Sequence, residues 1–198
     1  SYGYTVEYYF DGTKATTGNF APKPGTAEFQ QNILTAAQIT VENTVTYDSK
    51  SYVLESVDSR DKTVTADAAN NVVKVYYAVD VIGPEGPDNI PDKYQREVTY
   101  KVDKGGWNDK TGAAAKADVT EVVTLKTNGE LDVNGTAVLN APAVGSNPDT
   151  GYKAGSWAPA LPATFTKTSP VEYTYTYVKN SYGYTVEYYF DGTKATTG

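Results

Sequence analysis

The first 18 residues of the chain recur, letter for letter, at its end. Residues 1–18 read SYGYTVEYYFDGTKATTG, and residues 181–198 repeat them without a difference. The repeat period is therefore 180 residues, so the chain holds one full period and the opening of the next. Such identity is typical of a tandem array, in which each repeat folds beside its neighbour. We expect small modules in an extended, beaded arrangement along the chain.

Within one period, the sequence divides into two segments of similar pattern. Residues 1–80 and residues 94–180 each begin and end with runs rich in Tyr, Val and Thr, which favour β-strands. The intervening residues 81–93 are rich in Pro, Gly and Asp, as is typical of a linker. The sequence thus predicts two modules joined by a linker, with residues 181–198 as the opening strand of the next repeat.

Alternation of apolar and polar residues indicates which side of each strand faces a core. On this basis, we expect the core-facing residues of the first module to include Tyr2, Tyr4, Val6, Tyr8, Phe10, Val73, Val75, Tyr77 and Val79. In the closing strand of the second module, the corresponding residues are Val171, Tyr173, Tyr175 and Tyr177. The pattern predicts mainly β modules.

One segment of the first module has a helical pattern instead. Thr26 is placed to cap a helix whose apolar side presents Phe29, Ile33, Leu34 and Ala37. The fold class predicted from the sequence is therefore mainly β to α+β, with two small modules in tandem.

The first module resembles the mucin-binding-protein (MucBP-like) repeats of Gram-positive surface adhesins. The resemblance rests on YTVEYYFDGT at 4–13, YVLESVD at 52–58 and NVVKVYYAV at 71–79. It implies a non-catalytic β-grasp-like module on a cell-wall protein, outside the cell.

The second module resembles the Listeria–Bacteroides (internalin-B-type) repeat. The residues that carry this resemblance are GYKAGSW at 151–157 and the strand YTYTY at 173–177. This family, too, implies a small β-grasp-like unit strung along a surface protein. The resemblance by itself identifies no ligand.

The composition excludes several classes of chemistry. The chain has no His and no Cys, so imidazole catalysis, thiol chemistry and His/Cys metal sites are absent, and we expect no cofactor. A net charge of −7 argues against nucleic acid as a partner, and no apolar run is long enough for membrane insertion. A hydrolase would need two facing carboxylates, and nothing marks such a pair. We therefore expect a non-catalytic protein and, since it contains no Met, a piece of a longer one.

Two sets of residues are candidates for binding. Asp80, Asp88 and Asp92 supply oxygen ligands that could hold Ca²⁺, although a solvated hinge explains the same residues. The aromatic residues Tyr9, Tyr76 and Trp107 are candidates for stacking on sugars. Trp107 follows two glycines and is expected on a turn, within reach of solvent, although local packing explains it better than sugar binding.

The repeated terminal segment is the most specific feature. An identical sequence can fill an identical place, so we expect the segment to pair with another chain, by strand exchange or at a sheet edge. The residues that would make this head-to-tail contact are Tyr182, Tyr184, Val186, Tyr188 and Phe190.

Two functions from different classes remain open. The first is a stalk or spacer of a bacterial surface adhesin or filament, whose partners are the neighbouring repeats. The alternative is an adhesive module that binds mucin or another host glycan. An exposed aromatic patch with polar neighbours would favour the alternative, and tyrosines that all face inward would favour the spacer.

Overall fold

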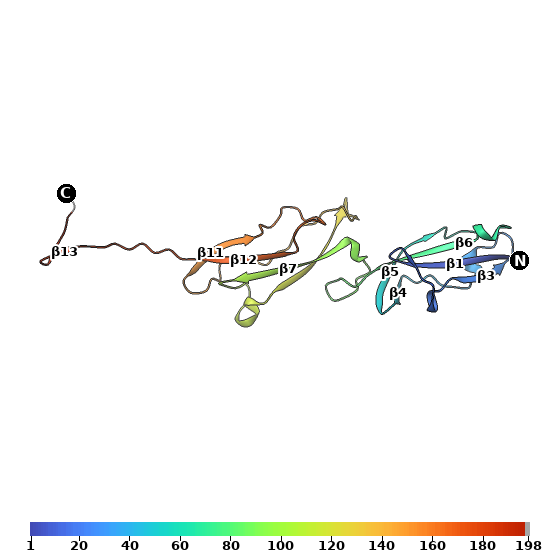
Figure 1. The fold of residues 1–198 in the computed structure, drawn as a ribbon, viewed down its shortest axis with the longest axis horizontal. Coiled ribbons are helices and arrows are strands. Elements are labelled where there is room, and N and C mark those ends of the chain that lie inside the picture. Colours follow the sequence, from blue (N-terminus) through green and yellow to red (C-terminus); the bar gives the residue numbers. More distant parts are fainter. Residues whose placement is uncertain (197–198) are drawn as a thin grey trace. The chain divides into compact units, whose positions relative to one another are not determined.

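The computed structural model describes residues 1–196. The last two residues of the predicted second opening strand, Thr197 and Gly198, lie outside the described residues. The chain forms two compact units (Figure 1). The first unit comprises Ser1–Thr99, Thr120–Asn140 and Pro162–Val171, and the second comprises Tyr100–Val119, Ala141–Leu161 and the residues from Glu172 onward. The division into modules at residues 81–93 stays a prediction.

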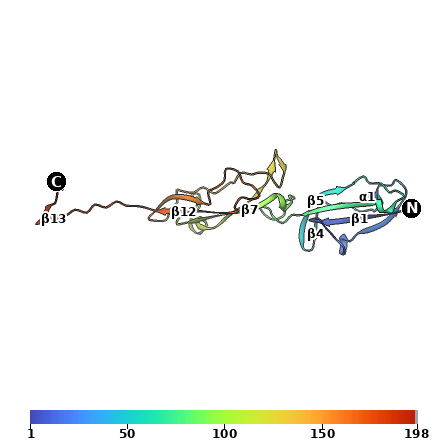
Figure 2. The same ribbon diagram turned by 45° about the horizontal axis from the view of Figure 1, so that its top comes forward.

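The first unit contains a mixed six-stranded sheet, whose strands lie side by side in Figures 1 and 2. The strand order is β2-β1-β6-β5-β4, and β3 also pairs with β1. The central strands β1 and β6 run parallel, and the other pairs are antiparallel. The strands are β1 (Tyr2–Phe10), β2 (Thr13–Lys14), β3 (Lys23–Ala27), β4 (Thr44–Tyr47), β5 (Lys50–Asp58) and β6 (Val72–Val79).

The core of this unit lies on the face that alternation predicts. In β1, Tyr4, Val6, Tyr8 and Phe10 are buried, whereas Tyr2 at the strand end is 38% exposed. In β6, Val73, Val75 and Tyr77 are buried as predicted, whereas Val79 is only partly buried and its neighbour Ala78 is buried instead. The period-2 prediction is thus confirmed along most of both central strands, because each strand turns alternate side chains to opposite faces.

The predicted helix is much shorter than its apolar pattern indicates. It is the single turn α1 (Ile33–Ala36), capped by Asn32, whose Oδ1 accepts hydrogen bonds from the amides of Leu34 and Thr35. The prediction of a cap at Thr26 is wrong, because that residue belongs to β3. Phe29, expected on the apolar side, is 57% exposed.

The remaining long strands form a four-stranded sheet in the order β11-β12-β7-β8. A two-residue turn at Asn128-Gly129 joins the short hairpin β9–β10, as this dipeptide predicts, because both residues have positive φ. The strands are β7 (Gln95–Asp103), β8 (Val119–Thr124), β9 (Lys126–Thr127), β10 (Glu130–Leu131), β11 (Tyr152–Ala158) and β12 (Glu172–Lys179).

The closing strand β12 keeps its predicted face. Tyr173, Tyr175 and Tyr177 are buried, while Val171 lies before the strand and is 37% exposed. The described chain also contains four short 3₁₀ helices, η1 (Gly18–Phe20), η2 (Ala68–Asn70), η3 (Asp92–Tyr94) and η4 (Gly112–Lys116). The mainly β fold class is confirmed. Among the helices of residues 1–196, none is long and apolar enough to cross a membrane.

Candidate functional site

Two tyrosines lie side by side on the outer face of the six-stranded sheet. Tyr9 of β1 and Tyr76 of β6 are register partners, and their ring centroids are 5.1 Å apart with an interplanar angle of 31°. Both side chains are partly exposed, because they alternate with buried neighbours. Glu7 and Lys74 are also register partners on the same face. We call these four residues the Tyr9–Tyr76 patch.

Hydrogen bonds fix the charge state of this patch. The Tyr9 hydroxyl donates to Oε2 of Glu7 at 2.8 Å, and the Lys14 ammonium also donates to the Glu7 carboxylate. The hydrogen bond to Glu7, with burial, raises the pKa of Tyr9 to about 12. Burial acts to raise the pKa of Glu7, but the hydrogen bonds from Lys14 and Tyr9 outweigh it and leave that pKa below its ordinary value.

At neutral pH, the patch therefore combines two ring faces with an ionised carboxylate. The Lys74 ammonium lies 5.8 Å from the centroid of the Tyr9 ring and adds a donor nearby. Ring faces with flanking hydrogen-bonding groups suit the apolar face and the hydroxyls of a sugar. Because the pKa of Tyr9 is raised and that of Glu7 is lowered, neither group changes its protonation state near neutral pH.

The third aromatic candidate, Trp107, lies in the core of the second unit. Its side chain is fully buried, its Nε1 donates to the carbonyl of Ala117 at 2.7 Å, and its ring stacks on Trp157. The expectation that Trp107 reaches solvent is therefore wrong, and the packing interpretation explains its contacts. Sugar stacking on this ring would require the local structure to open.

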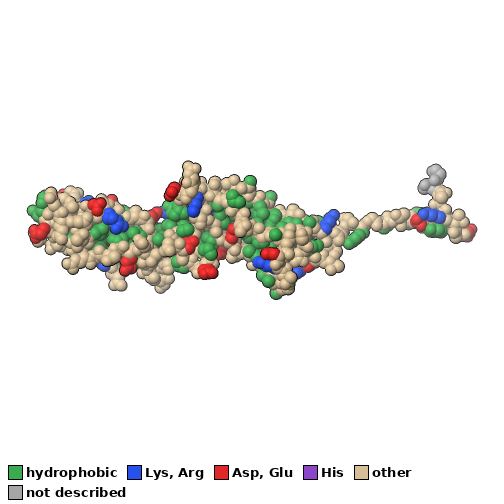
Figure 3. All heavy atoms as spheres, turned by 180° about the vertical axis from the view of Figure 1, so that it is seen from behind, with side chains coloured by type: hydrophobic (Ala, Val, Ile, Leu, Met, Phe, Trp, Pro, Cys, Tyr) green, Lys and Arg blue, Asp and Glu red, His purple; other side chains and the backbone are tan. Residues whose placement is uncertain are grey.

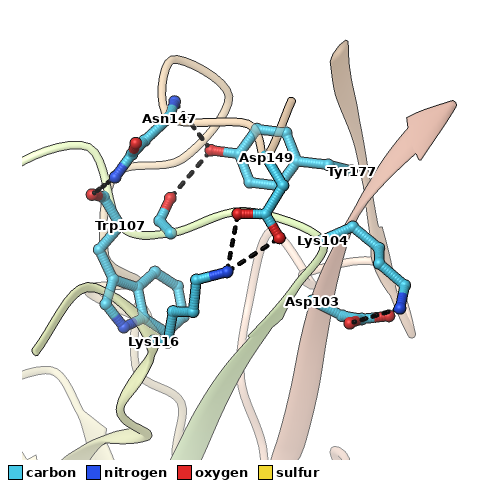
Figure 4. Close-up of polar contacts among 8 residues, drawn as sticks. Asp103, Lys104, Trp107, Lys116, Asn147, Asp149 and Tyr177 are labelled. Carbon is cyan, nitrogen blue, oxygen red and sulfur yellow. Dashed lines mark hydrogen bonds and ion pairs between the residues drawn. The ribbon is translucent and has the colours of Figure 1, made fainter. Parts of the chain in front are cut away.

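Tyr177 holds the loops that cover this tryptophan (Figure 4). Its hydroxyl donates to the Gly106 carbonyl at 2.9 Å and accepts from the amide of Gly145, also at 2.9 Å. Asn147 donates from Nδ2 to the carbonyl of Trp107 at 3.0 Å. Farther out, Lys116 contacts both carboxylate oxygens of Asp149 at 2.7 and 2.8 Å. No local motif indicates this network, because its members come from segments far apart in the chain.

The carboxylates of the three aspartates proposed for Ca²⁺ accept hydrogen bonds from other groups of the protein. Both oxygens of the buried Asp80 accept backbone amides, from Asp88 at 3.0 Å and Asn89 at 2.8 Å. Asp92 accepts the two amides of residues 81 and 82 through one oxygen, each at 2.9 Å. Across residues 1–196, no three acidic side chains gather to hold a metal ion. These aspartates order the segment between them.

The segment expected to pair with another chain is uncovered. Figure 3 shows apolar side chains of this segment at the surface. Its last residues form a small hairpin of β13 (Tyr189–Phe190) and β14 (Thr193–Lys194). The five predicted contact residues are all exposed: Tyr182 by 80%, Tyr184 by 88%, Val186 by 57%, Tyr188 by 66% and Phe190 by 70%. Their pairing with another chain stays a prediction.

No family model matches the chain, and no curated protein matches it. One similar solved structure is that of Streptococcal High Identity Repeats in Tandem (SHIRT) domains 3-4 from a cell surface protein, with 14% identity, a TM-score of 0.33, and coverage of 91% of this chain and 99% of that chain. Another is Mub-RV, with 16% identity, a TM-score of 0.24, and coverage of 91% and 100%. Both TM-scores lie below 0.5, so neither similarity carries an argument about function.

Proposed function

We propose that this chain is a non-catalytic spacer segment from the tandem repeats of a bacterial cell-surface adhesin, attached to the cell wall and located outside the cell. The repeat of residues 1–18 at 181–198 carries the proposal. Lys179 ends β12, and Tyr182 corresponds to the first residue of β1, so two residues separate one repeat from the next. A joint this short restricts how far successive repeats can turn, as a spacer requires.

The connector within the period also supports a stiff chain. Residues 81–93 have the composition of a flexible linker, but the carboxylates of Asp80 and Asp92 bind four backbone amides there. Lys93 adds an ion pair with Glu55 of β5. Because hydrogen bonds to a charged acceptor are stronger than neutral ones, this connector resists bending more than its composition predicts.

The parallel pairing of β1 with β6 fits a chain under tension. β1 opens the first module and β6 leads into the connector, and their register runs from Thr5↔Val72 to Phe10↔Tyr77. Tension that pulls on the start of β1 and the end of β6 slides two parallel strands past each other. All hydrogen bonds between them then bear the load together, rather than opening one by one.

The test compares chains that contain one, two and three copies of the 180-residue period. If the repeats are spacers, small-angle X-ray scattering will give a maximum dimension that grows by equal increments with each added copy. A two-copy chain with the same maximum dimension as a one-copy chain would contradict the proposal, because repeats that fold back on each other cannot set a distance.

A second candidate function is the binding of mucin or another host glycan by the Tyr9–Tyr76 patch. The favouring observation is the paired, partly exposed rings with Glu7 and Lys74 beside them. Tyr189 gives a matched control, since it has the sequence neighbours of Tyr9 and the same hydrogen bond to a glutamate, from Oη to Glu187, but belongs to a segment without β6 beside it. If the patch binds glycans, Tyr9→Ala will abolish saturable binding to immobilised mucin and Tyr189→Ala will leave it unchanged. Equal loss in both variants, or no binding by the original chain, rules out this function.

A further inference from the structure

The two copies of the 18-residue segment share one local structure. In both hairpins the strands pair in the same register, with Tyr9↔Lys14 matched by Tyr189↔Lys194. The turn residues agree as well, with φ of 47° at Asp11 and 45° at the equivalent residue of the second copy. The second copy therefore already has the hairpin that ends β1.

Their surroundings are entirely different. The first copy lies between β3, paired with residues 2–6, and β6, paired with residues 5–10. Val6 is fully buried there, and Tyr8 and Phe10 are 3% and 4% exposed. The equivalent residues of the second copy are exposed, and beside them lies a hollow of about 640 Å³ lined by Val186, Tyr188 and Ala195, among others.

We propose that residues 182–190 are a second β1, which takes the place of β1 between β3 and β6 in another copy of this chain when that copy's own β1 is weakened. The partner follows from sequence identity: each contact that β1 makes with β3, β6 and the core can be made by residues of the same type. The proposal concerns self-association and does not depend on the spacer function.

Energetics decide when the exchange occurs. The incoming and outgoing strands are identical, so the exchange changes few contacts, and its cost is the freedom lost when two chains associate. The chain's own β1 is tethered beside its site, which gives it a high effective concentration. The unaltered chain is therefore mainly monomeric, and exchange becomes dominant when the chain's own β1 is weakened.

Identical copies allow a matched test in the full chain. Val6→Asp places a carboxylate at a fully buried position and weakens the first copy's hold on its site by at least about 100-fold. Light scattering coupled to size-exclusion chromatography is then expected to give multiples of 21.3 kDa, with the first unit folded by circular dichroism. Val186→Asp makes the same change in the exposed copy and is expected to leave a monomer.

Two further measurements separate strand exchange from misfolding. The double variant Val6→Asp/Val186→Asp has no unaltered copy of β1, so it is expected to lose both the oligomer and the fold of the first unit. A synthetic peptide with the sequence of residues 1–18, added in excess to Val6→Asp, is expected to fill the site and return the protein to a monomer. The proposal is overturned if Val6→Asp stays monomeric, if the double variant forms the same oligomer, or if the peptide has no effect.

Discussion

Replacing Asp80 with alanine tests whether the connector is held by its aspartates. The substitution removes a carboxylate that is 1% exposed and that accepts two charge-assisted hydrogen bonds, from the amides of Asp88 and Asn89. Hydrogen bonds to charged groups contribute about 1.5–3 kcal/mol each. Because Asn89 is exposed, water can satisfy part of the loss, so we expect Asp80→Ala to lower the free energy of unfolding by about 2–4 kcal/mol.

Urea denaturation measures this change, and hydrogen exchange locates it. For the first unit, which has about 130 residues, the expected loss corresponds to a melting temperature lower by about 7–15 °C. The amides of Asp88 and Asn89 should exchange faster than those of β1 and β6, which keep their partners. Asp61→Ala, at an exposed turn, is the control and should change stability by less than about 0.5 kcal/mol. If Asp80→Ala matches this control in both measurements, the carboxylate does not hold the connector.

Three more predictions follow from single contacts. The hydrogen bonds from Lys14 and Tyr9 hold the pKa of Glu7 below its ordinary value, so the stabilisation from Glu7 is present at neutral pH and is lost as the pH falls through the lowered folded pKa. Glu7→Gln should therefore destabilise the protein at pH 7 and have little effect at pH 2, and an equal effect at both would contradict this assignment. Trp107→Phe removes the hydrogen bond to Ala117 and should cost about 1–3 kcal/mol in urea denaturation, whereas a neutral result would mean that the indole N–H is not needed. Gly105→Ala would bring a Cβ within 2.4 Å of the Tyr177 ring and should lower the melting temperature, unlike Gly183→Ala, whose Cβ meets nothing within 4 Å.

The faces of the central strands could be predicted because they depend on a local rule. Alternate side chains of a strand point to opposite faces, so one buried residue fixes the rest of the face. Val6 and Val73 are both fully buried, as this rule requires once their strands belong to a sheet. The same rule places Tyr9 and Tyr76 on the outer face, but it does not show that they are neighbours. Their adjacency depends on the parallel register of β1 with β6, which the sequence does not specify.

The helix prediction failed where tertiary pairing competed with local pattern. The residues around Thr26 belong to β3, which pairs with β1 from Tyr2↔Ala27 to Val6↔Lys23. Only the turn after Asn32 remained free to become helical, and Gln38 follows it with a φ of 50°, which is not helical. An apolar spacing of three and four residues was therefore present without the helix it usually indicates.

The surroundings of Asp80 and Trp107 could not be predicted for a related reason. Acidic residues among Pro and Gly usually indicate a solvated turn, but Asp80 reaches amides eight and nine residues farther on. Trp107 follows a Gly-Gly pair, yet the chain returns over it through Asn147, 40 residues away. Neither contact can be predicted from the neighbouring residues in the sequence, since each depends on the position of a segment farther along the chain.

The two copies of the repeated segment show which parts of its structure depend on its own sequence and which depend on neighbouring strands. The same 18 letters give the same hairpin twice, so the turn at Asp11-Gly12 and its copy need only their own sequence. The nine-residue strand β1 has no counterpart in the second copy, where only residues 189 and 190 are in strand conformation before the turn. Extended pairing over residues 2–8 therefore depends on β3 and β6, not on the strand propensity of the segment. The conformation of residues 2–8 and of their copy is therefore determined by the strands beside them rather than by their own sequence, which is the premise that the Val6→Asp experiment tests.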